Sequence, residues 1–156
     1  MLTFTTDVLS GAVEVTGPVS ATIWASSDAV DTDFTATLID VEPAGSGAGT
    51  GEKAIILCEG IVRARFRNGT DNPEMMTPGD IYEFGIDMWD TSNLFKEGHR
   101  IRIEISSSNF PRYNRNLNSG NPIATDTEIT IDNQTVYHDS EHPSHVTLPV
   151  IPLAAE

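Results

Sequence analysis

Residues 100–106 read Arg100-Ile101-Arg102-Ile103-Glu104-Ile105-Ser106, and this stretch decides the fold class because isoleucines alternate with charged and polar residues. Successive side chains of a β-strand point to opposite faces, so the alternation predicts a strand with one buried face and one solvated face. The same pattern recurs through the chain. The other segments expected to form strands are 19–25, 34–38, 62–66, 82–88, 129–131 and 146–148.

Turn-forming residues separate these segments, among them Gly17-Pro18, Asn68-Gly69 and Pro78-Gly79. No window of eleven residues keeps the apolar spacing of a helix, and residues 91–96 are expected to form at most a short helical turn. The glycine-rich run 45–51 is interpreted as a surface loop. We therefore predict an all-β antiparallel β-sandwich, with residues 1–156 as one domain.

The charge balance excludes one class of partner. The chain holds 23 acidic residues against 9 basic ones, a net charge of -14, which repels a nucleic-acid backbone. No stretch approaches the roughly 20 apolar residues that a membrane helix needs, so no membrane contact is expected. The single cysteine, Cys58, cannot form an internal disulfide, and Met1 to Thr6 show no signal-peptide pattern; a cytoplasmic location is the expectation.

Motifs for covalent catalysis and phosphate binding are missing from the sequence. No G-x-S-x-G nucleophile motif occurs, and Ser46, the nearest approach, lacks the outer glycines. Residues 45–53 do not complete a phosphate-binding glycine loop. We expect no cofactor, and we expect that the chain alone is not an enzyme.

One histidine segment resembles a zinc motif. His138-Asp139-Ser140-Glu141-His142 fits H-x-x-E-H, which binds zinc when both histidines lie on one helical face. Pro143 follows directly and the preceding residues favour extended structure, so solvated or hydrogen-bonded histidines are the preferred interpretation. A surface zinc site that includes His145 stays as an alternative.

A cluster of acidic residues allows a second metal hypothesis. Asp28, Asp31 and Asp33 are weak candidates for calcium, which prefers six to eight oxygen ligands. The other interpretations are that these carboxylates are solvated, cap turns, or pair with arginines on the expected 62–66 strand. That strand would place three arginines on one face, where burial would require partners for them: Arg63, Arg65 and Arg67.

Several runs together resemble a known family. They include Val13 to Val19, Leu38 to Pro43, Gly60 to Arg67, Ile105 to Asn116 and Thr135 to Ser144. In this order they are similar to the C-terminal domain of bacterial X-Pro dipeptidyl-peptidases and cocaine esterases. The resemblance implies a jelly roll of the galactose-binding type that follows an α/β-hydrolase domain with a Ser-Asp-His triad. None of the triad residues maps onto this sequence.

The resemblance leads to a functional hypothesis: a non-catalytic domain that packs on the α/β-hydrolase domain of its parent chain and helps shape the substrate cleft. The expected cleft or interdomain residues lie in one loop: Asn109, Phe110, Pro111, Arg112, Tyr113 and Asn116. A carbohydrate-binding or ligand-binding module, with Trp24 or Trp89 as a stacking platform, is one alternative. A structural or homo-oligomerisation domain is another. A domain that packs on a neighbour is also expected to expose an unusually large apolar patch when alone.

Overall fold

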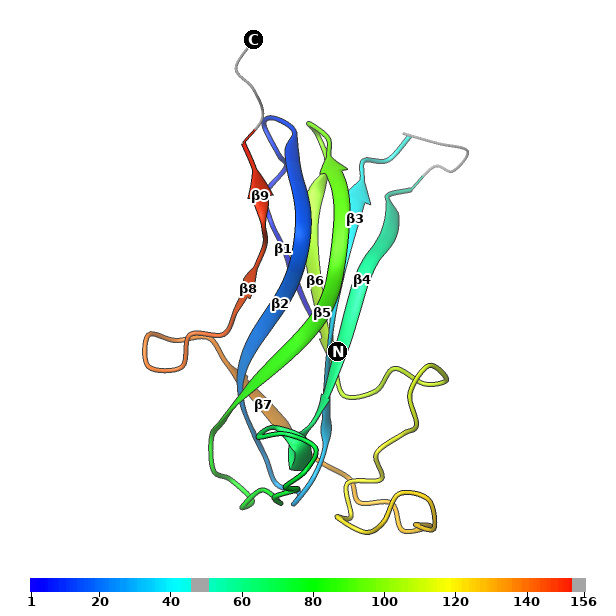
Figure 1. Cartoon of the computed structure of the whole chain (residues 1–156). Coiled ribbons are helices and arrows are strands. Elements are labelled where there is room, and N and C mark those ends of the chain that lie inside the picture. Colours follow the sequence, from blue (N-terminus) through cyan, green and yellow to red (C-terminus); the bar gives the residue numbers. More distant parts are fainter. Residues whose placement is uncertain (46–50, 153–156) are drawn as a thin grey trace.

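Two antiparallel sheets stack face to face in the computed structural model, which describes residues 1–45 and 51–152 (Figure 1). One sheet has the strand order β1 (Leu2–Thr5), β6 (Arg100–Ser106), β3 (Asp33–Glu42) and β4 (Lys53–Arg63). The chain is an all-β sandwich, as the alternation predicted. The galactose-binding type of jelly roll within this class stays a prediction.

The second sheet is organised around one long strand, β2 (Val13–Ser27). β5 (Tyr82–Phe95) pairs with one edge of β2. Three short strands share its other edge in turn: β7 (Gln134–Tyr137), β8 (His145–Thr147) and β9 (Val150–Ile151). β2 therefore runs along the whole of this sheet. β9 pairs near the start of β2, and β7 pairs near its end.

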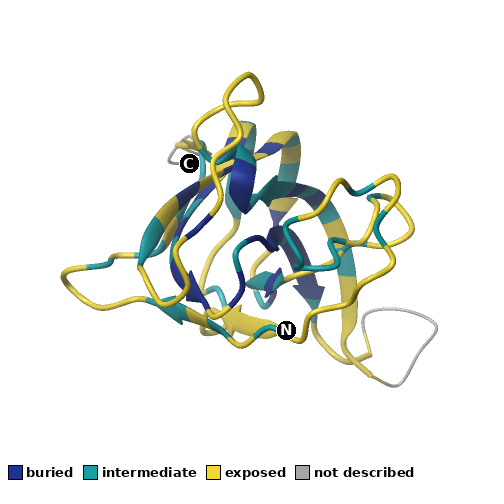
Figure 2. Ribbon diagram, turned by 90° about the horizontal axis from the view of Figure 1, so that it is seen from below, coloured by how far each residue is buried: buried dark blue, intermediate teal, exposed yellow. Residues whose placement is uncertain are grey.

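The core lies between the two sheets and is built by the alternating side chains. Phe34 of β3 and Phe84 of β5 meet across the gap with ring centroids 4.8 Å apart. Both are almost fully buried, as are Leu38, Ile86 and Met88. Figure 2 shows the buried residues on the strands and exposed residues along most of the loops.

The two sides of the sandwich differ. On one side β4 packs closely on β5, and a Cβ atom on Gly60 would lie only 2.0 Å from the Asp87 carbonyl oxygen. On the other side β1 forms the edge of its sheet, and all four of its residues are exposed. We call this second side, between β1 and the β7–β8 edge, the open side.

The predicted strand at 62–66 is wrong in its position. β4 ends at Arg63, and Ala64–Phe66 form a 3-10 turn. The cause is visible at Asp31, whose carboxylate accepts hydrogen bonds from the backbone N–H and the side chain of Arg65. This pairing turns the backbone out of the extended conformation, so the three arginines do not share one strand face.

Two further segments differ from what their local sequence allowed. Residues 91–95 are extended, not helical, because they pair with residues 13–17 of β2 beyond a bulge at which Trp89 has a φ of 68°. Ile129 and Ile131 lie outside any strand and are exposed. Residues 46–50, and with them Ser46, lie outside the described residues. Within the described part of the chain, no helix is long and apolar enough to cross a membrane.

Candidate functional site

The candidate loop leaves β6 at Ser106 and returns to the second sheet at β7, so that it lies at one end of the sandwich (Figure 1). Its first part closes a turn, because the Tyr113 N–H donates to the Asn109 carbonyl at 3.1 Å. The Phe110–Pro111 peptide bond inside this turn is cis. The Phe110 side chain is 66% exposed, which makes it a large apolar group presented to the outside.

Glu59 of β4 fixes both flanks of this turn. Its Oε2 accepts a hydrogen bond from Asn109 Nδ2 at 2.9 Å, and its Oε1 accepts one from Arg112 Nη1. The contact with the Glu59 carboxylate raises the pKa of the Arg112 guanidinium. Arg112 also lies 5.5 Å from the Tyr113 ring centroid. One carboxylate on a strand therefore holds the segment on either side of Phe110.

Asn116 fixes the next part of the loop. Its Nδ2 donates to Asp31 Oδ2 at 2.8 Å and to Asp33 Oδ1 at 2.9 Å. Its Oδ1 accepts from the Asn118 N–H at 3.0 Å. The side-chain amide thus joins the loop to two carboxylates at the start of β3.

Those two carboxylates are buried and paired with arginine. Arg63 donates through Nε and Nη2 to the two oxygens of Asp33 at 2.7 and 2.9 Å. Arg65 Nε donates to Asp31 Oδ2 at 2.8 Å. Hydrogen bonding to Asp33 raises the pKa of the Arg63 guanidinium. Of the interpretations open for these acidic residues, pairing with arginines is the one that holds for Asp31 and Asp33. We call these five residues the anchor cluster: Asp31, Asp33, Arg63, Arg65 and Asn116.

The arginines of the anchor cluster also reach the loop backbone. Arg63 Nη2 donates to the Asn114 carbonyl at 3.1 Å, and Arg65 Nη2 donates to the Asn121 carbonyl at 3.3 Å. Buried charge is costly unless it is paired and its remaining groups are hydrogen-bonded. Here the same contacts that satisfy the charges hold the loop in place.

Arg67, the third arginine, belongs to a different contact. Its guanidinium carbon lies 4.4 Å from the Tyr82 ring centroid, and its Nη1 donates to the Glu74 carbonyl at 2.6 Å. Arg67 therefore fixes the segment between the 3-10 turn and β5. Although Arg67 is only two residues from Arg65 in the sequence, it does not belong to the anchor cluster.

The three calcium candidates do not form one site. Asp28 lies apart from the anchor cluster and accepts two hydrogen bonds from Asn133, from the backbone N–H at 2.8 Å and from Nδ2 at 2.7 Å. These bonds lower the pKa of the Asp28 carboxyl. Among the described residues, no group of three or more His, Cys, Asp or Glu side chains is placed to hold a metal ion.

The histidines of the zinc motif face different surroundings. Residues 138–143 form no helix, and His138 makes an isolated bridge with Pro143. His142 packs against Trp24 with ring centroids 5.3 Å apart, and His145 Nδ1 lies 2.7 Å from the Pro143 carbonyl oxygen. Trp24, on the central strand β2, is half-buried, and Trp89, on the edge strand β5, is 65% exposed.

Two histidines pair with carboxylates, His99 and His142. His99 Nδ1 lies 2.8 Å from Asp40 Oδ1 in a buried position, and His142 Nδ1 lies 3.4 Å from Asp139 Oδ1 at the surface. Neither histidine has a serine hydroxyl as a hydrogen-bond partner among the described residues. The candidate loop combines an exposed aromatic group, Phe110, with hydrogen bonds that attach it to the sandwich.

Fold and site together define an all-β domain that presents a firmly attached loop. Comparison with known proteins shows the family to which this domain belongs. Residues 1–147 match the model of the X-Pro dipeptidyl-peptidase C-terminal non-catalytic domain. The chain belongs to that family, and it is a non-catalytic domain of the hydrolases in which the family occurs.

The similar proteins are much longer than this chain. A cocaine esterase of Rhodococcus sp. (strain MB1 Bresler) is 50% identical over 153 residues, which cover 97% of this chain and 25% of the esterase. The crystal structure of an aminopeptidase from a marine sediment Thaumarchaeota archaeon superposes with a TM-score of 0.91 at 28% identity, covering 97% and 26%. An α-amino acid ester hydrolase gives a TM-score of 0.88 at 29% identity, covering 96% and 25%. This chain spans about a quarter of the length of these relatives.

Proposed function

We propose that the chain packs on the α/β-hydrolase domain of a longer parent protein and that residues 109–116 form part of the wall of its substrate cleft. The observation that carries the proposal is Phe110, an exposed aromatic side chain between two flanks that Glu59 holds in place. Binding residues are often found on loops that a rigid scaffold positions.

The chemistry of the loop supports this role. The outward group is apolar and aromatic, while three polar side chains of the same loop, those of Asn109, Arg112 and Asn116, are hydrogen-bonded to carboxylates of the sandwich. An aromatic ring can contact the acyl or aryl part of an ester or the side chain of a peptide substrate. The relatives named above are an esterase, an aminopeptidase and an ester hydrolase, which favours a parent that cleaves esters or peptides.

A chimera provides the test. The matching C-terminal quarter of the Rhodococcus cocaine esterase is replaced by this chain, and kcat/KM for cocaine is measured with and without Phe110→Ala. We expect the substitution to lower kcat/KM about tenfold or more, because a cleft wall that positions substrate is lost. The urea midpoint should not change, since the exposed ring contributes little to the core.

Trp89→Ala is the matched control, because Trp89 is as exposed as Phe110 but lies on β5. It should leave kcat/KM within about twofold. If both substitutions have the same effect, the loop has no part in the cleft. The isolated chain should hydrolyse neither an X-Pro anilide nor a simple ester above the buffer rate, and clear turnover would contradict the non-catalytic role of this domain.

A further inference from the structure

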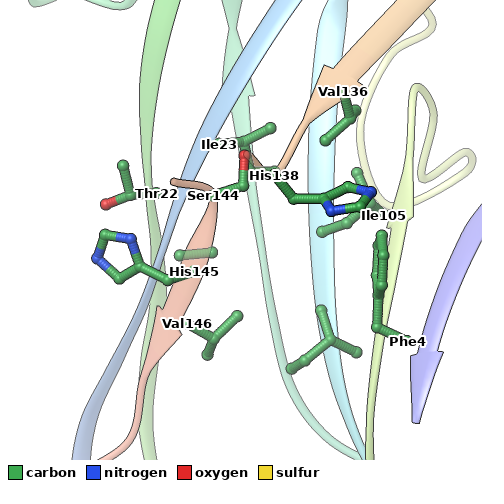
Figure 3. Close-up of a pocket in the computed structure, with 11 residues that line it drawn as sticks. Phe4, Thr22, Ile23, Ile105, Val136, His138, Ser144, His145 and Val146 are labelled. Carbon is green, nitrogen blue, oxygen red and sulfur yellow. The ribbon is translucent and has the colours of Figure 1, made fainter. Parts of the chain in front are cut away.

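The open side of the sandwich contains an apolar pocket of about 380 Å³ between the two sheets. Phe4 of β1 and Ile103 and Ile105 of β6 form one wall, and residues of the second sheet, including Val136 and Val146, form the other. Figure 3 shows the side chains of His138 and Phe4 close to one another among the residues that line it, and their ring centroids lie 6.1 Å apart in an edge contact. A second pocket, of about 230 Å³, shares Ile105 and Val136 with the first and extends along the same side to Met1 and Leu2.

The side chains of β1 show that this side of the core is incomplete. Leu2 and Phe4 are paired with Ile105 and Ile103 and lie on the inner face of their sheet. They are nevertheless 44% and 43% exposed, whereas core positions such as Phe34 and Phe84 are almost fully buried. Apolar groups that face the interior of a sandwich and remain open to water favour a covering partner. The outer edge of β1 also has no partner strand in the described part of the chain.

We infer that the open side is closed by an extended apolar segment from the catalytic part of the longer parent protein, whose side chains fill the pocket between the sheets. This inference rests on the packing of the chain against that part, as proposed above. In the relatives, about three quarters of the protein lies outside the matched region, and the family is described as a C-terminal domain. The preceding part of such a protein reaches this domain at β1, which is one wall of the pocket.

The residues that line the pocket indicate which kind of segment would fill it. Its walls are mainly aliphatic and aromatic, with only histidine, serine and threonine as polar residues, so they offer no fixed charge to a charged side chain. An unpaired strand edge can accept a further strand, which leaves alternate side chains to enter the pocket. A second copy of this chain is a poorer occupant, because both copies would carry a net charge of -14.

Thiol labelling tests the inference without any need for activity. Cys58, the natural cysteine, is buried, and burial raises the pKa of its thiol, so its background reaction is slow. Phe4→Cys is introduced into the isolated chain and into the chimera with cocaine esterase. We expect the new thiol to react readily with a maleimide in the isolated chain and at least tenfold more slowly in the folded chimera.

Ile56→Cys is the matched control, because Ile56 is exposed on β4 at the opposite edge of the same sheet. Its labelling rate should change less between the two proteins than that of Phe4→Cys. Where Phe4→Cys does not fold, Val146→Cys repeats the measurement on the opposite wall of the pocket.

Three outcomes would overturn the inference. These are equal labelling of Phe4→Cys in both proteins, protection in the isolated monomer as strong as that of Cys58, and protection in the isolated chain that appears only with a dimer mass. The last result would assign the open side to a second copy. Protection in the chimera together with normal kinetics of the Phe110→Ala variant would support the inference while contradicting the cleft role of the loop.

Discussion

At Gly60 the absence of a side chain allows β4 and β5 to approach on the side of the sandwich away from the open side, which we call the closed side. A Cβ atom there would also lie 2.9 Å from Ile86 Cγ2, so the neighbouring side chain cannot simply move into free space. The close approach involves backbone as well as side chain, and backbone moves less readily than the end of a flexible side chain. The spacing of the two sheets on this side therefore depends on one residue.

Gly60→Ala should lower the free energy of unfolding by about 1–3 kcal/mol, because the added methyl group forces the strands apart. Urea unfolding followed by circular dichroism measures the change. Gly85→Ala on β5 is the control, since no atom lies within 4 Å of the position of its Cβ. Equal stability of the two variants would show that the closed side can adapt to a wider spacing.

Asp28 makes a contact that depends on pH. Hydrogen bonds from Asn133 lower the pKa of this carboxyl from its ordinary value of 3.8. A depressed pKa in the folded state means that the stabilisation is present above pH 3.8 and is lost as pH falls through the lowered pKa. An NMR titration of the Asp28 carboxyl should give a midpoint below 3.8, and Asn133→Ala should move it back toward that value. A midpoint unaffected by Asn133→Ala would mean that another group depresses it.

The conformation of the loop between β6 and β7 depends on buried charge. The anchor cluster places two carboxylates and two guanidinium groups together, and the Asn116 amide donates to both carboxylates. A neutral donor is required there, because each carboxylate already has its arginine. The loop is thus attached to the sandwich by a balanced set of charges and not by apolar packing alone.

Asn116→Asp should destabilise the protein at pH 7 by about 2–4 kcal/mol, since it replaces the donor with a third carboxylate beside Asp31 and Asp33. The loss should shrink at lower pH as the new carboxyl becomes protonated. Asn114→Asp is the control on the same loop, because Asn114 is exposed and meets Arg63 through its backbone carbonyl. Hydrogen exchange of the loop amides measures the attachment of the loop, and urea unfolding measures the stability of the protein. Similar behaviour of both variants would contradict the proposed role of Asn116.

The elements also show where sequence reasoning succeeded. Regular alternation located β6 and the central parts of β2, β3 and β5, because a half-buried strand has a period of two residues. It missed the start of β4, where Ala54 to Leu57 are consecutive apolar residues on an edge strand. It misplaced the segment around Arg65, since a long-range contact with Asp31 replaces local preference there.

The candidate loop was predictable in part. The composition of residues 109–116 indicates a binding loop, and pairing with arginines is one of the interpretations that the sequence leaves open for the aspartates. The attachment of Asn109 and Arg112 to Glu59, 50 and 53 residues away, could not be predicted, because no local pattern connects these positions. The open side was equally hidden, since β1 is only four residues long and is read as a strand only from its pairing with β6.

For the whole molecule, one shared core joins the two sheets. Phe34 belongs to the four-stranded sheet and contacts Phe84 of the other, while both tryptophans, Trp24 and Trp89, lie in the five-stranded sheet. The tryptophans therefore report on a sheet that does not contain Phe34. This arrangement allows cooperativity between the sheets to be tested.

Phe34→Ala should lower the free energy of unfolding by about 3–5 kcal/mol, through the lost burial and the cavity that remains. If the sheets unfold as one unit, tryptophan fluorescence and far-UV circular dichroism should give the same, lower urea midpoint. Phe110→Ala, a change of the same size on the surface, is the control and should leave the midpoint unchanged. A fluorescence midpoint that stays at the wild-type value would show that the sheets unfold separately.

The long strand β2 pairs with β9 at Glu14 and Val15, near one end, and with β7 near the other end. At that second end the Ser27 hydroxyl donates a hydrogen bond to Asp132 of the candidate loop. At about 3.3 Å per residue these two levels are separated by roughly 40 Å. A surface tether or fluorescent reporter attached just after β9 would therefore stand at the far pole of the molecule from Phe110. Immobilised in that orientation, the domain would leave its aromatic loop facing the solution, ready for direct binding measurements against isolated hydrolase domains.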